Sequence, residues 1–264
     1  MLFILQQRFG VVTMKSDTLT KGLTVVFLMT AIMTPVYATT LGTADLVSTH
    51  MGASQAIDIY GAGYSGQEIY AGVYMLTKSA GSGVSEIWDN GDNIAGFCIE
   101  AEEPYPNTVT HYDLVTTESA TVTVLSEAVG TGKAALLSEL WGRYYDSSWQ
   151  DGSYATTENN AASAFAAAVW EIIYEDMPSS SADYDVSIDN TIGLGGFAST
   201  TVDEVLANSW LQSLDGTGSM ESLLVFTADG SQNYLVAVPE PMTVLLLGMG
   251  GALSVARKRR RVVA

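Results

Sequence analysis

Residues 159–175 read NNAASAFAAAVWEIIYE, and this stretch decides how the rest of the chain is interpreted. Large apolar side chains recur in it at the spacing of one helix face, and alanine fills most other positions. That face consists of Phe165, Val169, Ile172 and Ile173. Because alanine side chains are small, the pattern predicts a helix that lies close against a sheet. Pro178 predicts the end of this helix.

Similar helical spacing of apolar residues occurs over residues 133–145 and 202–214. Segments that alternate between apolar and polar residues predict strands, and turns rich in Gly, Asp and Asn separate them. The predicted strands cover residues 69–76, 94–99, 111–114, 120–125, 223–227 and 234–238. We therefore expect one α+β domain, with an antiparallel β-sandwich or barrel-like core and about three helices.

The central part of the chain is strongly acidic. From Thr39 to Val238, three basic residues stand against 27 Asp and Glu residues, which gives a formal charge of −24. Such a surface repels the phosphates of nucleic acids and anionic lipids, so we expect no nucleic acid partner. A solvated acidic surface accounts for the charge, and a specific cation site is the alternative.

The N-terminal residues have the order of a secretory signal peptide. A positively charged segment precedes the apolar run GLTVVFLMTAIM over residues 22–33, and the small-residue pattern predicts cleavage between Ala38 and Thr39. A membrane span needs about 20 apolar residues, so this run is short for one. We expect residues 1–38 to form a removable signal helix, with Met14 as an alternative start. A buried helix of the mature domain is the competing interpretation.

The C-terminal residues 238–264 read VPEPMTVLLLGMGGALSVARKRRRVVA. Two prolines block regular structure and predict an extended, accessible peptide. The uncharged stretch over residues 242–256 predicts a transmembrane helix, and five positive charges follow it. Positive charge beside an apolar span stays on the cytoplasmic side, so the acidic domain is expected outside. The motif and the basic cluster consist of Pro239, Glu240, Pro241, Arg257, Lys258, Arg259, Arg260 and Arg261.

This tail closely resembles the PEP-CTERM sorting signal of Gram-negative bacteria. The resemblance implies passage through the general secretion machinery, a transient stop in the inner membrane and cleavage near the motif by an exosortase. The mature protein is then expected at the cell surface or in the extracellular matrix, because the family is associated with biofilm and exopolysaccharide production. The implied organisation is a signal peptide over 1–38, an exported domain over 39–237 and a sorting signal over 238–264. An ordinary single-span tail anchor is the alternative.

A second resemblance joins FCIE, at residues 97–100, with FAAAVWEI, at residues 165–172. The pair is similar to the thioester-domain pattern of surface adhesins, where the helix reads roughly Gln-x-Ala-Ile-Trp. In that family the cysteine and glutamine side chains form an internal thioester. Cys98 and Trp170 match the pattern, whereas Ala166 occupies the glutamine position and has no acyl carbon. The resemblance implies a shared scaffold that has lost its covalent chemistry. Ordinary core packing of Cys98 and Trp170 is the alternative.

The chain contains none of the motifs HExxH, CxxC, GxSxG or GxxxxGK, and it has only two histidines. We therefore expect no enzyme activity, cofactor or metal, and predict an adhesion or structural module. Its candidate partner is an exopolysaccharide or another cell-surface ligand. One alternative is an extracellular hydrolase of unrecognised type that acts on matrix polysaccharide. Glu100, Glu102 and Glu103 are the carboxylates considered for a glycosidase-type pair. The other alternative is a Ca²⁺-dependent adhesion module that uses Asp89, Asp92, Asp183, Asp185 and Asp189.

Overall fold

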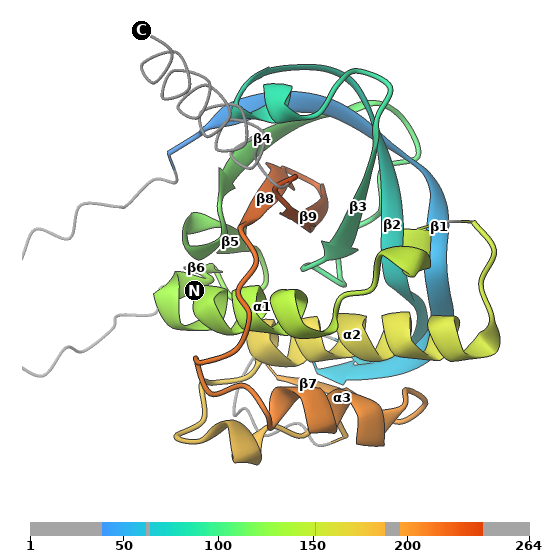
Figure 1. Cartoon of the computed structure of the whole chain (residues 1–264), viewed down its shortest axis with the longest axis vertical. Coiled ribbons are helices and arrows are strands. Elements are labelled where there is room, and N and C mark those ends of the chain that lie inside the picture. The colour runs from blue at the N-terminus through green and yellow to red at the C-terminus, as the bar shows by residue number, and fades with distance from the viewer. Residues whose placement is uncertain (1–38, 62–63, 151, 188–195, 240–264) are drawn as a thin grey trace, which may run out of the picture. The chain divides into compact units, whose positions relative to one another are not determined.

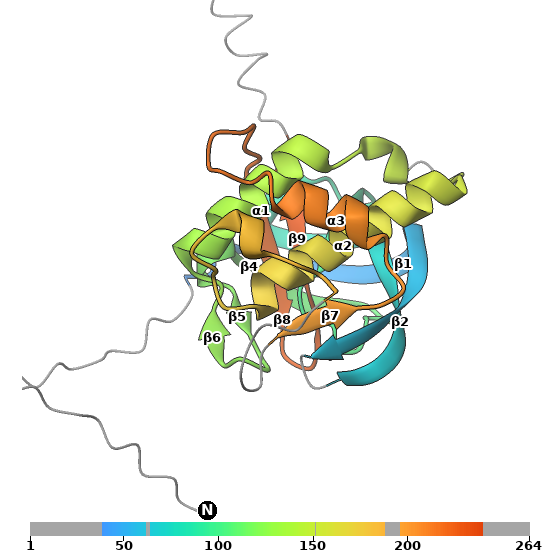
Figure 2. The ribbon, with the colours of Figure 1, turned by 90° about the horizontal axis from the view of Figure 1, so that it is seen from below.

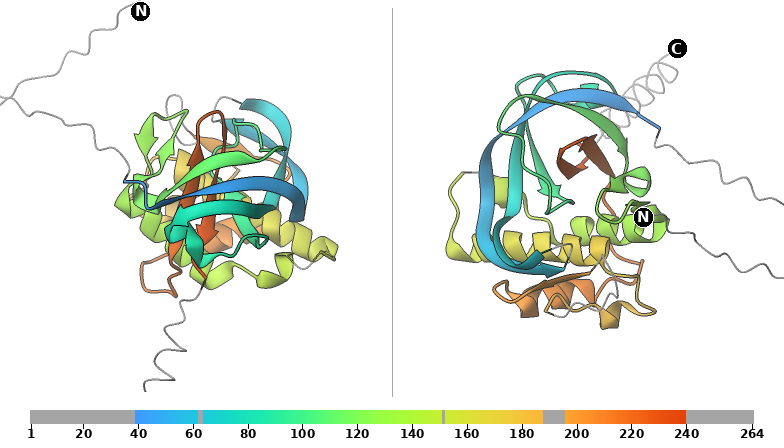
Figure 3. Two further views of the ribbon diagram at one scale, coloured as in Figure 1. Left: turned by 90° about the horizontal axis from the view of Figure 1, so that it is seen from above. Right: turned by 180° about the vertical axis from the view of Figure 1, so that it is seen from behind.

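The computed structural model describes residues 39–61, 64–150, 152–187 and 196–239. Its longest feature is an antiparallel pair of strands, β1 (Gly42–Gly61) and β2 (Tyr64–Gly83), which curves around the sheet (Figures 1 and 3). The predicted strand over residues 69–76 is confirmed as the centre of β2. No strand was predicted over β1, because its register shifts break the alternation of buried and exposed residues that marks a strand.

The long pair forms part of a closed ring of strands. The ring continues through β3 (Asn93–Cys98), β9 (Ser231–Ala237), β8 (Leu223–Ala228) and β4 (Thr110–Thr116). Strand β4 then pairs with the first residues of β1, and β1 pairs with β2, so the antiparallel pairings return to their starting point. The short strand β7 (Phe197–Ser199) pairs with the other end of β1. The expected antiparallel core is therefore a barrel.

Three α-helices in the described residues lie together at one end of this barrel (Figures 1 and 2). They are α1 (Gly130–Tyr144), α2 (Thr156–Tyr174) and α3 (Glu204–Leu211), and they confirm the three predicted helices. Helix α2 contacts β1 and β2 on one side and α3 on another. Every residue of α2 from Ala162 to Tyr174 is buried, so alanine allows close packing around the whole helix.

The predicted strand over residues 120–125 is wrong beyond its first residues. Strand β5 (Thr121–Val122) pairs only with β6 (Glu127–Ala128), and a tight turn occupies the residues between them. The Ser126 N–H donates to the Thr123 carbonyl oxygen at 3.1 Å, and Ser126 has a positive φ of 54°. This turn bends the chain back before the alternating Thr and Val residues can extend into a longer strand.

Helices α1 and α2 are joined to the barrel by a cluster of aromatic rings. Phe97 on β3 lies at its centre, 4.6 Å from the Phe165 ring and 5.4 Å from the Trp141 ring, measured between centroids. Tyr145 and Trp149 complete the cluster with edge-to-face contacts to Phe97. Phe97 and Phe165 are both fully buried, so one residue of β3 packs against both α1 and α2.

Within the residues that the structure describes, no helix combines the length and apolar character needed to cross a membrane. The predicted signal helix over residues 1–38 and the predicted transmembrane helix over 242–256 lie outside those residues.

A buried carboxylate on α1 joins this helix to the segment before β8. Glu139 accepts hydrogen bonds from the N–H groups of Gly216 (2.8 Å) and Gly218 (2.9 Å), and from Arg143 Nη1 (3.0 Å). Burial alone would raise the pKa of Glu139, but these hydrogen bonds together hold the pKa below its ordinary value.

Glu139→Gln is therefore expected to lower the free energy of unfolding at neutral pH by about 1–3 kcal/mol. Because the folded pKa of Glu139 is lowered, its contribution is present above the unfolded pKa of about 4.3 and is lost as pH falls through the folded value. Urea unfolding at pH 7 and at pH 3 should show a difference from wild type that shrinks at pH 3. The exposed Glu118→Gln is the matched control, and equal losses in both variants would contradict the prediction.

Candidate functional site

Cys98 is the last residue of β3 and is 1% exposed. Neighbouring residues of a strand point to opposite faces, so Cys98 points away from the helix-facing ring of Phe97 and into the barrel. Tyrosine rings from β2, β4 and β9 meet there, with Tyr234 5.3 Å from Tyr74 and 6.2 Å from Tyr112 between centroids. Burial raises the pKa of the Cys98 thiol well above its ordinary value, so the thiol is protonated and a poor nucleophile.

The motif helix places Trp170 near this thiol. Trp170 is 1% exposed, and its side chain forms a hydrogen bond with the Cys98 thiol that acts to lower the pKa of the thiol. Burial has the larger effect and raises that pKa. Ala166, also 1% exposed, lies one helical turn before Trp170 and therefore on the same face of α2. The structure thus brings the strand and helix motifs together, but residue 166 offers only a methyl group. A thioester between Cys98 and residue 166 is chemically impossible.

The chain directly after Cys98 is held by two tyrosine hydroxyls. Tyr174 on α2 accepts a hydrogen bond from the Ala101 N–H at 3.0 Å and donates to Glu102 Oε2 at 2.6 Å. Tyr64 on β2 donates to the Ala101 carbonyl oxygen at 2.8 Å. Burial raises the pKa of the Glu102 carboxyl group. These bonds fix the position of Glu102 at the rim of the barrel.

Glu100 is also held in place, but it points elsewhere. Its carboxylate accepts a hydrogen bond from the Thr123 N–H at 2.7 Å, and the residue is 1% exposed. Burial raises the pKa of Glu100, and the hydrogen bond from Thr123 acts in the opposite direction. Glu100 therefore anchors the β5–β6 hairpin to the end of β3.

A groove of about 720 Å³ opens beside Glu102 and Trp170. We call it the tyrosine groove, and its defining residues are Tyr64, Tyr70, Tyr74, Glu102, Tyr105 and Trp170. The rings of Tyr70 and Tyr105 are 63% and 57% exposed, which is unusual for side chains of this size. They come from β2 and from the segment between β3 and β4.

The polar side chains deepest in the tyrosine groove are closed off from solvent and make contacts within the protein. Trp170 interacts with the Cys98 thiol. The Glu102 carboxylate accepts a hydrogen bond from the Val124 N–H in addition to that from Tyr174. The polar side chains that remain accessible in the groove are Gln67 and Asn107, which are exposed, and Glu103, which is half-buried.

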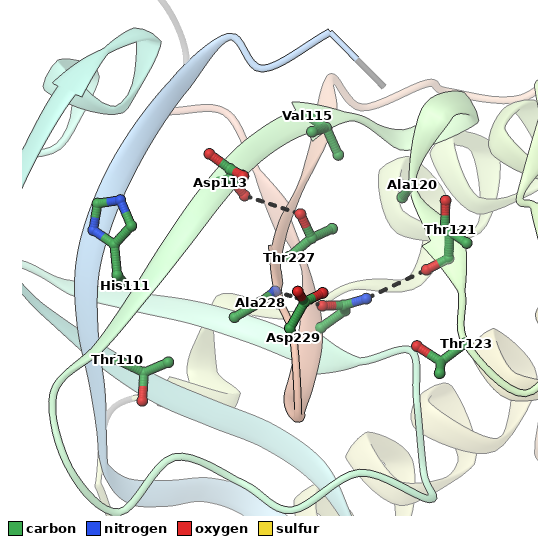
Figure 4. Close-up of a pocket in the computed structure, with 11 residues that line it drawn as sticks. Thr110, His111, Asp113, Val115, Ala120, Thr121, Thr123, Thr227, Ala228 and Asp229 are labelled. Atoms are coloured by element: carbon green, nitrogen blue, oxygen red, sulfur yellow. Dashed lines mark hydrogen bonds between the residues drawn. The ribbon is translucent and has the colours of Figure 1, made fainter. Parts of the chain in front are cut away.

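A second hollow, of about 640 Å³, lies over β4, β8 and β5 (Figure 4). Its walls carry threonines and two carboxylates, Asp113 and Asp229. The Asn233 side chain bridges this hollow, since it accepts from the Ala228 N–H at 3.0 Å and donates to the Thr121 carbonyl oxygen at 3.4 Å. Its central amide is thus already used within the protein.

Two of the acidic residues considered for Ca²⁺ accept hydrogen bonds from groups of the protein. Asp92 Oδ2 accepts from the Asp89 N–H at 2.8 Å, and Asp185 Oδ1 accepts from Ser187 and from Asn208. Among the described residues, no three His, Cys, Asp or Glu side chains are grouped as a metal site would need. Asp189 lies outside the described residues.

The predicted processing sites fall at the limits of the described chain. Thr39 and Pro239 are described, whereas Ala38, Glu240, Pro241 and the basic cluster from Arg257 to Arg261 lie outside. The last strand, β9, ends at Ala237, two residues before Pro239.

Sequence reasoning did not single out the tyrosine groove. Its two exposed rings stand 35 positions apart in the chain, and neither belongs to a motif. The one local signal is Pro104-Tyr105-Pro106, which holds an aromatic residue between two prolines directly after the FCIE strand. Comparison of the chain with protein-family models, curated proteins and solved structures gives no match.

Proposed function

We propose that the chain is a non-enzymatic adhesion or structural protein that is exported, sorted by an exosortase and retained at the cell surface or in an extracellular matrix. The observation that carries this proposal is the order of signals in the sequence. An export signal precedes the acidic domain, and a PEP motif, an apolar span and a basic cluster follow it. The general secretion machinery and the exosortase are the implied partners, with a transient membrane stop between them.

The geometry around Cys98 supports the non-covalent part of the proposal. The only thiol of the chain is buried and its pKa is raised, and Ala166 stands where a thioester needs glutamine. The neighbouring acids are a poor fit to a glycosidase pair, since the Glu100 carboxylate accepts from the Thr123 N–H and is not among the described residues that line the tyrosine groove. We therefore favour a binding role over the hydrolase alternative.

The position of the motif supports sorting after folding. Because β9 ends at Ala237, the PEP motif follows the last barrel strand with no intervening element. An enzyme that cleaves near the motif would meet a short peptide next to a closed barrel.

Intact mass spectrometry of protein recovered outside the cell tests the proposal. We expect an N-terminus at Thr39, a C-terminus near Pro241 and one alkylation at Cys98 only after denaturation. Replacing Pro239, Glu240 and Pro241 with alanines should leave an unprocessed form in the membrane, while Glu118→Ala should be processed normally. Normal processing of the triple variant would refute the sorting proposal. A mass deficit of one ammonia with Cys98 blocked would instead restore covalent adhesion.

A further inference from the structure

The tyrosine groove combines two kinds of surface that seldom occur together. Tyr70 and Tyr105 offer broad exposed rings, and the exposed amides of Gln67 and Asn107 belong to the same lining. Binding sites for small ligands typically have this composition, with apolar walls and a few convergent polar groups. The volume of about 720 Å³ lies in the range of such sites.

The rings and the polar atoms together suit a sugar. A pyranose presents an apolar face of C–H groups that stacks on an aromatic ring, and hydroxyls around its edge. A hydroxyl group both donates and accepts hydrogen bonds, and so does a side-chain amide. The exposed amides of Gln67 and Asn107 and the half-buried carboxylate of Glu103 therefore suit the hydroxyls of a sugar.

Charge restricts the class of sugar. Glu102 and Glu103 both line the groove, and its described lining residues include one histidine, His50, and no Lys or Arg. The three Lys and Arg residues between Thr39 and Val238 are Lys78, Lys133 and Arg143. A uronate, sulfated or phosphorylated chain would meet two carboxylates with no Lys or Arg beside them. A neutral glycan carries no such cost.

We infer that the tyrosine groove binds a neutral polysaccharide chain without covalent attachment. Tyr70 and Tyr105 stack on sugar rings, and the exposed amides of Gln67 and Asn107 form hydrogen bonds with the sugar hydroxyls. The inference deepens the proposed matrix function by naming its ligand class, and in the cell it rests on export of the domain. Binding itself depends only on the groove, so its test is independent of sorting.

Isothermal titration of the full chain in mild detergent tests this inference. The neutral probes are cellohexaose, laminarihexaose, mannohexaose and a galactan hexasaccharide, and the acidic probe is hexagalacturonate. We expect at least one neutral hexasaccharide to bind with a dissociation constant of about 1 mM or tighter, and hexagalacturonate not to bind. A panel without a neutral binder, or preferential binding of the uronate, would overturn the inference.

Variants connect binding to the groove. Tyr70→Ala and Tyr105→Ala should each weaken binding of the best neutral hexasaccharide about tenfold, and Asn107→Ala, which removes an exposed amide of the groove, about fivefold. Tyr60→Ala is the matched control, because Tyr60 is an exposed tyrosine of β1 outside the groove. Far-UV circular dichroism confirms that each variant folds.

Unchanged affinity in folded Tyr70→Ala and Tyr105→Ala variants would place the sugar elsewhere and overturn the inference. Aromatic grooves also bind proline-rich peptides, so a deca-proline peptide is included in the titration. Tighter binding of that peptide than of any glycan would assign the groove to a protein partner and would equally overturn the inference.

Discussion

Phe97→Ala is expected to lower the free energy of unfolding by about 3–5 kcal/mol. The ring is fully buried and makes contacts with Trp141, Trp149 and Phe165 at the same time. Its removal leaves a cavity between β3 and both helices, and the rings around it are too rigid to fill the space. A loss of this size is a large part of the stability of a typical domain.

Chemical denaturation followed by tryptophan fluorescence measures this loss. Trp141 and Trp149 lie against Phe97, so their emission reports directly on the cluster. Phe97→Leu should recover more than half of the lost stability, because it refills much of the volume. Tyr60→Ala removes a half-exposed ring and should cost less than about 1 kcal/mol. A Phe97→Ala loss no greater than that of Tyr60→Ala would show that the cluster does not join the helices to the barrel.

Gly72→Ala is expected to lower the free energy of unfolding by about 2–5 kcal/mol. Gly72 lies in β2 with a φ of 147°, a conformation that residues with a side chain rarely adopt. A Cβ at this position would overlap the carbonyl oxygen of Ala53 and lie 2.6 Å from Ser54 Cα, both on β1. The strain and the clash add, and backbone atoms of a paired strand cannot move aside as a flexible side chain does.

The matched control for this prediction is Gly230→Ala in the turn between β8 and β9. Gly230 also has a positive φ, of 70°, but no atom lies within 4 Å of the position of its added Cβ. Its substitution should cost only the backbone strain, about 1–2 kcal/mol. Thermal unfolding of both variants separates the two contributions. Equal losses would mean that β1 and β2 do not approach closely at Ala53 and Gly72.

The helices were predicted more reliably than the strands, and the reason is local. Phe165, Val169 and Ile172 repeat with the period of a helix over several turns, whatever surrounds them. Strand β1 lacks an equally local signal, because its register shifts between Ser48 and His50 and between Met51 and Ser54 change which residues face the core. Closure of the barrel depends on pairing of β1 with β4, which no local pattern encodes.

The candidate site divides in the same way. Cys98 and Trp170 belong to motifs that could be located in the sequence, and the structure places them near each other. The tyrosine groove could not be predicted, because the exposure of Tyr70 and Tyr105 and their place beside the same groove arise only from tertiary packing. Neither ring stands in a sequence pattern that would mark it as exposed.

The strand order also determines when the domain can become complete during synthesis. Strands β1, β2, β3 and β4 precede residue 117, yet β3 and β4 have no pairing with each other. The gap between them is filled by β8 and β9, which end at Ala237. A ribosome must therefore deliver almost the whole domain before the ring can close, and until then the nascent chain keeps two unpaired edges. The chain therefore acquires its barrel only after the last hairpin emerges.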